Sequence, residues 1–310
     1  MAAPRSSSRN LPDRSPPPSR PRLVNPSGSK SGIVRVGAKL ARWRDPYHLL
    51  LTMSWVQYFI LTFISFVAAN ALFAFLYLLG GDGIANAQPG SFPDAFFFSV
   101  QTMASIGYGA MYPTTTWANV VVTIEALTGL LGLAMATGLM FARFARPTAR
   151  VLFSKTAVIT VQDDLPTLML RAANQRHNQV IEAQTRMTLV RNVTTPEGEF
   201  MRRFYDMKLV RSQTPVFVLT WTIMHPIDSD SPLYGMTAED LAEVEAEVVV
   251  TLTGLDETFA QTIHARYSYI ASEILWNMRF EDILSRLPDG RRAVDYRRFH
   301  EVAPAREAKL

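Results

Sequence analysis

The stretch TMASIGYG, residues 102–109, has the residue types of a backbone that binds a cation. Gly107 and Gly109 flank a tyrosine directly after a segment rich in hydroxyl side chains. Glycine adopts positive φ at little cost, so glycines that alternate with L-residues allow successive carbonyl groups to turn to one side. Rings of such carbonyl oxygens replace the water around a dehydrated cation. A GYG tripeptide alone is a weak signal, and its meaning depends on the elements that position it.

Two apolar segments enclose this stretch, at residues 49–79 and 120–144. The first has no charged residue, and the second has one acid, Glu125. A helix that crosses a bilayer needs about 20 apolar residues, so both segments predict membrane spans. Residues 91–104 have the length and composition of a short helix between them. Such a helix re-enters the membrane only under cover of protein, because unpaired backbone in lipid is too costly.

The charges predict the topology. Lys and Arg residues cluster before the first span and after the second, whereas residues 80–119 contain none. The positive-inside rule therefore places both termini in the cytoplasm. Asp45 and Pro46 are typical of a helix start, which predicts a short amphipathic helix on the inner membrane surface. A simple extension of the first span is the alternative.

The remaining sequence has a different composition. Residues 1–44 are basic and rich in Pro and Ser, which predicts disorder, with attraction to anionic lipid as a further reading. Beyond Arg150, the runs QTRMTLVRN, VFVLTWTIM and EVVVTLTG predict strands bounded by TTPEG, DSDSP and GLDET, and Thr237 caps one helix. The chain has no cysteine, its five histidines are scattered, and no motif indicates an enzyme or a nucleic-acid partner.

The stretch at 102–109, with its flanking spans, resembles the potassium channel pore, whose usual signature is Thr-Val-Gly-Tyr-Gly and from which the carbonyl-ring mechanism is taken. RAANQRHNQVIEAQTRMTLVR, WTIMHPIDSDSPLYG and ARYSYIASEILWNMRFEDIL resemble the cytoplasmic domain of inward rectifier potassium channels, the bacterial branch in particular. The resemblance covers residues 44–299. It implies a membrane α plus cytoplasmic β protein: a two-transmembrane-helix pore with a re-entrant pore helix, followed by an immunoglobulin-like β-sandwich.

The domains expected from this resemblance are a disordered segment at 1–44, a transmembrane pore at 45–150, a cytoplasmic sandwich at 151–300 and a tail at 301–310. The implied selectivity filter binds K⁺ through carbonyl groups, with no other cofactor, and one filter strand per chain implies a homotetramer. The filter residues are Ser105, Ile106, Gly107, Tyr108 and Gly109. Ser105 stands in place of the usual threonine. This replacement retains the hydroxyl group but removes a methyl group.

On the second span, Leu133, Thr137 and Phe141 recur at i, i+4 and i+8 and share a face. The resemblance makes this face line the pore, with Phe141 at the inner gate. Gly129 matches the proposed bending point, while Gly132 and Gly138 equally suit close helix packing. An apolar Leu133 predicts weak rectification, because strongly rectifying relatives hold Mg²⁺ or polyamines there with Asp, Glu or Asn.

Animal relatives brace the filter with a Glu–Arg pair. Here the positions carry Gln101 and the apolar Ala110 and Met111, so no unpaired charge results. Glu125 is a candidate to bond behind the filter instead.

In the cytoplasmic part, Glu182 matches an acidic pore position, and Gly254 and Leu255 match a loop that narrows the pore. A solvated strand acid is the alternative for Glu182. The cluster expected to bind anionic lipid comprises Arg143, Arg146, Arg150 and Lys155. Ser54 stands where animal relatives have an arginine of the lipid site, which weakens the transfer of that site.

We therefore expect a tetrameric, potassium-selective channel in a bacterial inner membrane, gated at the inner helix bundle and cytoplasmic domain, modulated by anionic lipid and blocked by Ba²⁺. A weakly selective cation channel and a non-conducting, membrane-anchored sensor are the alternatives.

Overall fold

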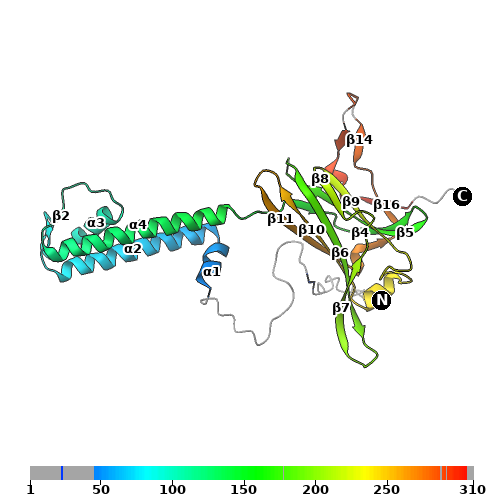
Figure 1. The fold of residues 1–310 in the computed structure, drawn as a ribbon, viewed down its shortest axis with the longest axis horizontal. Helices are drawn as coiled ribbons and strands as arrows, with labels where there is room; N and C mark the ends of the chain where they lie inside the picture. Colours follow the sequence, from blue (N-terminus) through cyan, green and yellow to red (C-terminus); the bar gives the residue numbers. More distant parts are fainter. Residues whose placement is uncertain (1–21, 24–44, 177, 287, 291, 306–310) are drawn as a thin grey trace, which may run out of the picture. The chain divides into compact units, whose positions relative to one another are not determined.

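The computed structural model describes residues 22–23, 45–176, 178–286, 288–290 and 292–305 (Figure 1). The chain divides into two compact units between Arg146 and Pro147. We call described residues 45–146 the helical unit and described residues 22–23 and 147–305 the sandwich unit. Apart from residues 22–23, the expected disordered segment at 1–44 lies outside the described residues, as does the end of the expected tail, 306–310.

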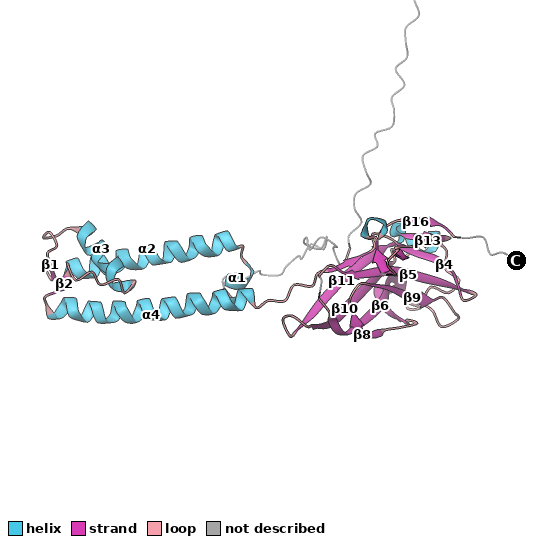
Figure 2. Ribbon diagram, turned by 90° about the horizontal axis from the view of Figure 1, so that it is seen from above, coloured by secondary structure: helices cyan, strands magenta, loops and turns pink. Residues whose placement is uncertain are grey.

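The helical unit contains α1 (Pro46–Thr52), α2 (Trp55–Leu79), α3 (Phe92–Met103) and α4 (Thr116–Phe144). The long helices α2 and α4 run side by side, and α3 lies at one end of the pair near a small sheet of β1 (Ile84–Ala85) and β2 (Tyr112–Pro113) (Figure 2). With 25 and 29 residues, α2 and α4 are long and apolar enough to cross a membrane.

The first apolar segment is not one helix, because the chain breaks at Met53 and Ser54. Ser54 Oγ accepts a hydrogen bond from Gln57 N at 3.2 Å, and Gln57 Oε1 accepts one from Ser54 N at 3.0 Å. This capping box starts α2 at Trp55. Asp45 caps α1 in the expected way, accepting from His48 N at 2.9 Å. The alternative in which residues 46–52 extend the first span is therefore wrong.

Two five-stranded sheets make up most of the sandwich unit. The first has the order β11 (Gln261–Ile270), β10 (Glu247–Asp256), β6 (Val180–Thr194) and β7 (Phe200–Met207), with β8 (Gln213–Phe217) also paired to β6. The second has the order β12 (Ile274–Trp276), β4 (Ala157–Gln162), β5 (Leu165–Asn174) and β3 (Val151–Phe153), with β9 (Thr220–Pro226) also paired to β5.

Apolar side chains from both sheets form one core. Leu168 and Leu170 of β5 and Leu189 and Leu252 of the first sheet are completely buried in it. The alternating burial along β10 places Val248, Val250 and Leu252 in this core, as expected for strands with one covered face. The expected β-sandwich is confirmed.

Several local expectations need adjustment. The run VFVLTWTIM divides into β8 and β9, and residues 254–256, expected in a turn, remain in β10 because they pair with β11. Residues 302–304, expected in the tail, form β16 (Val302–Pro304), which pairs with β13 (Met278–Phe280). Strands β14 (Leu284–Arg286) and β15 (Arg292–Val294) form a hairpin. Helix α5 (Ala238–Glu243) is capped by Thr237 as expected.

Candidate functional site

The predicted filter has an alternating backbone. Ser105, Gly107 and Gly109 have φ angles of 56°, 59° and 79°, whereas the intervening Ile106 and Tyr108 are not in the positive-φ region. This is the alternation for which the glycines were expected. Ser105 adopts a left-handed conformation that non-glycine residues populate sparsely, so its backbone depends on the surrounding structure.

The end of α3 holds the filter backbone. The carbonyl oxygen of Gln101 accepts hydrogen bonds from Ile106 N at 2.8 Å and Gly107 N at 3.4 Å. Beyond the filter, Asn86 Nδ2 donates to the Ala110 carbonyl oxygen at 2.7 Å. Asn86 was not predicted from the sequence; an isolated asparagine in a connecting segment gave no signal of this contact. The filter is thus fixed at both ends by neutral groups.

Glu125 bonds to the two helices beside α4, and its expected role in bracing the filter stays a prediction. It is completely buried on α4, and its carboxyl group contacts the Tyr77 hydroxyl group of α2 and the Ser99 hydroxyl group of α3. Helices α2, α3 and α4 therefore meet at one polar cluster inside the helical unit.

Gly129 packs against α3. A Cβ atom at this position would lie 2.6 Å from the carbonyl oxygen of Met103, whereas Gly132 and Gly138 face open space. Within one protomer, close helix packing thus requires Gly129, and a packing role of Gly132 or Gly138 against other protomers stays a prediction. Helix α4 continues through all of these glycines, and a bend at Gly129 stays a prediction.

Leu133, Thr137 and Phe141 lie along the exposed surface of α4. Leu133 is 67% exposed and Phe141 is 73% exposed in the single chain. Both residues belong to the C-terminal half of α4. Their pore-lining role stays a prediction, which an exposed position in one protomer permits.

The arginines after α4 differ in their contacts. Arg143 donates to the Leu50 and Met53 carbonyl oxygens, and its guanidinium group lies 4.6 Å from the Trp55 ring centre. Arg146 donates to the Leu51 carbonyl oxygen at 3.0 Å. Both therefore bond carbonyl groups at the end of α1 that helix geometry leaves without partners. Nothing in the local sequence indicated these contacts.

In the sandwich unit, the structure brings Glu182 close to Gly254. The register of β6 and β10 shifts between Thr253 and Leu255, and Glu182 has a φ of 50° at the bulge. A Cβ atom on Gly254 would lie 2.5 Å from Val180 Cγ1, so only glycine fits there. The expectation that Gly254 and Leu255 form a loop is wrong, because both residues are paired with β11 inside β10. The exposed carboxylate of Glu182 and Gly254 are neighbours on one sheet, although 72 positions separate them in the sequence.

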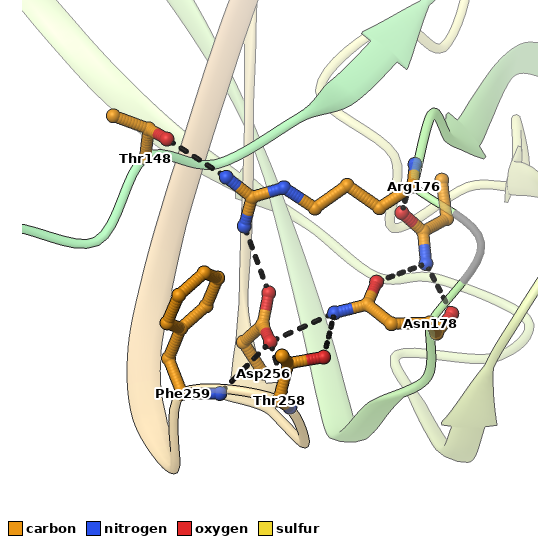
Figure 3. A network of polar contacts seen from close by, with 7 residues as sticks. Thr148, Arg176, Asn178, Asp256, Thr258 and Phe259 are labelled. Carbon is orange, nitrogen blue, oxygen red and sulfur yellow. Dashed lines mark hydrogen bonds and ion pairs between the residues drawn. The ribbon is translucent and has the colours of Figure 1, made fainter.

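Asp256 organises the end of the β10–β11 hairpin (Figure 3). Its side chain bonds Arg176 Nη1 at 3.0 Å and Asn178 Nδ2 at 2.8 Å. Arg176 Nη2 in turn donates to Thr148 Oγ1 at 2.9 Å. Burial alone would raise the pKa of Asp256, but these hydrogen bonds, together with the backbone N–H groups of Thr258 and Phe259, hold the pKa below its usual range.

The other two residues of the predicted lipid-binding cluster, Arg150 and Lys155, are exposed at the start of the sandwich unit. Among the described residues, no group of three or more His, Cys, Asp or Glu side chains could hold a metal ion.

Comparisons with known proteins cover nearly the whole chain. The family described as "Inward rectifier potassium channel C-terminal domain" matches residues 151–309, and the family described as "Ion channel" matches residues 49–146. The chain is 52% identical over 289 residues to the inward rectifier potassium channel Kirbac3.1 of Paramagnetospirillum magnetotacticum, covering 93% of this chain and 98% of the relative.

Animal proteins are similar at lower identity. Human inward rectifier potassium channel 4 is 39% identical over 68% of this chain and 49% of its own length. The ATP-sensitive inward rectifier potassium channel 12 of Gallus gallus is 32% identical over 83% of this chain and 65% of its own length. The match thus spans about half to two thirds of these relatives.

Proposed function

The chain belongs to the inward rectifier potassium channel family, and on that basis we propose that it forms a homotetrameric, potassium-selective pore. Each protomer contributes one filter strand, Ser105–Gly109, whose carbonyl oxygens bind K⁺ in the way known from potassium channels. The named relatives are channels, and no enzyme activity or further cofactor is proposed.

One observation carries this proposal. The φ angles of 56°, 59° and 79° at Ser105, Gly107 and Gly109 are the backbone alternation that turns successive carbonyl groups to one side. Residues 105–110 are all exposed in the single chain. Closed cyclic assembly covers such a strand with its own copies around the axis.

The gate is proposed at Phe141, below Leu133 and Thr137. A ring of exposed phenylalanines closes a narrow passage by excluding water. The apolar Leu133 supports weak rectification, and the exposed Glu182 beside Gly254 and Leu255 supports attraction of cations, including Mg²⁺ and polyamines, to the cytoplasmic entrance. Movement of the sandwich unit is proposed to open the gate.

Anionic lipid is proposed to bind at Arg146, Arg150 and Lys155, which are exposed. Each such charge contributes about 1 kcal/mol near an anionic surface. Arg143 belongs to the proposed cluster, but it is partly buried, with its guanidinium group bonded to two carbonyl oxygens and lying over the Trp55 ring, so its contribution is expected to be smaller than that of the exposed Arg146, which makes one such bond. The proposed location is a bacterial inner membrane with both termini in the cytoplasm, as the positive-inside rule requires.

The experiment that tests this function measures K⁺ and Na⁺ flux into liposomes that contain the purified protein, with Ba²⁺ as the blocker. We expect uptake that favours K⁺ and stops with Ba²⁺. Equal K⁺ and Na⁺ flux would instead support a weakly selective channel. Absence of flux from a folded tetramer, across a series of lipid compositions, would support a non-conducting sensor.

A further inference from the structure

A polar cluster lies inside the helical unit, and it consists of Asn70 and Tyr77 of α2, Ser99 of α3 and Glu125 of α4. Asn70, Ser99 and Glu125 are completely buried, and Tyr77 is 2% exposed. Buried polar groups are retained at a cost unless each is hydrogen-bonded. Each contact within the cluster therefore needs a hydrogen atom, and the number of hydrogen atoms that the side chains carry decides the protonation state of Glu125.

Three oxygen–oxygen contacts join the cluster. The Tyr77 hydroxyl group contacts Glu125 Oε2, the Ser99 hydroxyl group contacts Glu125 Oε1, and Ser99 Oγ lies 2.9 Å from Asn70 Oδ1. Each contact needs one hydrogen atom. Tyr77 and Ser99 carry one each.

The orientation of the Asn70 amide is decided by its other contacts. Asn70 Nδ2 lies 2.8 Å from the Phe66 carbonyl oxygen and 3.5 Å from Met103 Sδ. A reversed amide would place its oxygen against the Phe66 carbonyl oxygen, and two acceptors would then face each other. Asn70 Oδ1 therefore faces Ser99 and must accept the Ser99 hydrogen.

The third contact then lacks a hydrogen atom unless Glu125 provides it. If Ser99 donates to Asn70 and Tyr77 donates to Glu125 Oε2, an ionised Glu125 leaves Ser99 Oγ and Glu125 Oε1 as two acceptors in contact. A proton on Glu125 Oε1, donated to Ser99 Oγ, satisfies all three contacts.

Among the described residues of one protomer, no positive charge contacts Glu125 to stabilise an ionised carboxylate. Tyr77 is the only titratable group among the described residues that contacts Glu125, and α3 presents the uncharged Ser99. Arg143 lies about five turns further along α4 and is bonded to α1. Asp94, at the start of α3, bonds Gln88 N at 2.8 Å. An unpaired buried carboxylate inside a membrane helix bundle is strongly disfavoured.

We infer that Glu125 is a neutral carboxylic acid at neutral pH, and that its proton completes the hydrogen-bond cluster that positions the pore helix α3. Ser99 lies one turn before Met103, whose carbonyl oxygen packs against Gly129, and Gln101 between them holds the filter backbone. Loss of this proton at alkaline pH leaves the Ser99 contact without a hydrogen atom and loosens α3. Flux then falls although no filter residue has changed.

Infrared difference spectroscopy tests the protonation state directly. The spectrum of the wild-type tetramer minus that of Glu125→Gln at neutral pH is expected to show the C=O stretching band of a protonated carboxylic acid. The matched control is Glu243→Gln, which removes an exposed acid of α5 and should give no such band. Absence of the band from the Glu125→Gln difference would overturn the inference, whether or not the protein conducts.

The positioning role rests on the proposed channel function and is tested by flux against pH. In Glu125→Gln the amide oxygen accepts a hydrogen bond from Tyr77 and the amide nitrogen donates one to Ser99. This variant should therefore retain flux and should not show the decrease in flux that the wild type shows at alkaline pH. Glu125→Ala should lower flux by about tenfold or more, because two buried hydroxyl groups lose a partner. Where Glu125→Ala fails to assemble, Ser99→Ala tests the same contacts.

Two further results separate the alternatives. Tyr77→Phe should retain the alkaline fall, because the titrating group is Glu125; loss of the fall in Tyr77→Phe alone would assign it to Tyr77 and overturn the positioning role. If flux through Glu125→Gln decreases at alkaline pH as it does in the wild type, the positioning role is also overturned. If the wild type conducts nothing, the channel proposal fails, while the infrared result still decides the proton on Glu125.

Discussion

The helical and sandwich units place polar and apolar side chains in opposite ways. In the helical unit, Phe63 is 67% exposed and Leu131 is 56% exposed, whereas Asn70, Ser99 and Glu125 are completely buried. In the sandwich unit, Leu168, Leu170 and Leu252 are completely buried between the sheets.

The difference follows from the solvent of each unit. Lipid surrounds apolar side chains as favourably as a protein core does, so apolar surface gives membrane helices little reason to associate, and packing and buried hydrogen bonds hold them together. Water drives the apolar side chains of the sandwich into its core. A single physical rule, that polar groups need partners, therefore gives opposite patterns in the two units.

The largest expected effect is at the filter. Gly107→Ala should abolish K⁺ flux, because an L-residue in the left-handed conformation costs about 1–2 kcal/mol per residue and each protomer of the tetramer repeats that cost. Gly107 has open space around its Cβ position, so the cause is its φ of 59° and not a collision. Flux is measured in liposomes. Gly132→Ala, which is helical and also faces open space, is the control and should conduct; normal flux in Gly107→Ala would remove the filter assignment.

A pair of truncations tests the opposite arrangement of the two units directly. Leu170→Ala should lower the free energy of unfolding of the sandwich by about 2–5 kcal/mol, because it leaves a cavity between the sheets. Phe63→Ala, which removes a lipid-exposed side chain, should change the stability of the tetramer by less than about 0.5 kcal/mol. Thermal unfolding in detergent measures both. Equal losses would mean that Phe63 packs against protein in the assembly, and the comparison would fail for α2.

The next effect concerns the Asp256 network. Asp256→Asn should destabilise the sandwich by about 1–3 kcal/mol, since Arg176 loses its buried charge partner. The folded-state pKa of Asp256 is lowered, so its contribution is present above the ordinary aspartate pKa and is lost as pH falls through the folded pKa. Unfolding of wild type and variant should therefore converge in strong acid. A constant difference at every pH would show that the carboxylate charge has no part in the effect.

The smallest expected effect comes from His225. Burial lowers the pKa of its imidazole, which lies 2.6 Å from the Lys208 carbonyl oxygen and 2.7 Å from Ser231 Oγ. Because the unfolded state then binds more protons, stability is complete above the ordinary histidine pKa and declines as pH falls below it. The melting temperature should drop by about 2–4 °C in mild acid, and His225→Gln should reduce this pH dependence. The same acid-induced drop in His225→Gln would assign it to other groups.

The sequence was informative wherever a local pattern sufficed. The expected helix at residues 91–104 is α3 (Phe92–Met103), with Ser91 as its cap, and the second span is α4, which begins four residues earlier than expected. Capping residues predicted the starts of α1 and α5. The sequence left a continuous first span open as an alternative, because apolar residues continue through the break at Ser54. The signal for the break was the spacing of Ser54 and Gln57, which is that of a capping box.

Contacts between distant segments could not be predicted in this way. The reach of Arg143 back to α1, the packing of Gly129 on Met103 and the pairing of Arg176 with Asp256 depend on how helices and strands approach each other. None of these contacts has a periodic or spacing signal. Gly132 and Gly138 have the same residue type as Gly129, and only the position of α3 distinguishes them.

The amino-acid sequence by itself determined which segments are apolar enough to span a membrane, where glycines permit a left-handed backbone, and which runs form strands. These properties depend on residue type and on neighbours along the chain. Only the tertiary structure decided which partners the polar groups find: that Glu125 lies between Tyr77 and Ser99, that Glu182 is beside Gly254, and that Asp256 binds Arg176. The reason is that hydrogen bonds and close packing act over a few ångströms in space, at whatever separation along the chain the fold brings them together.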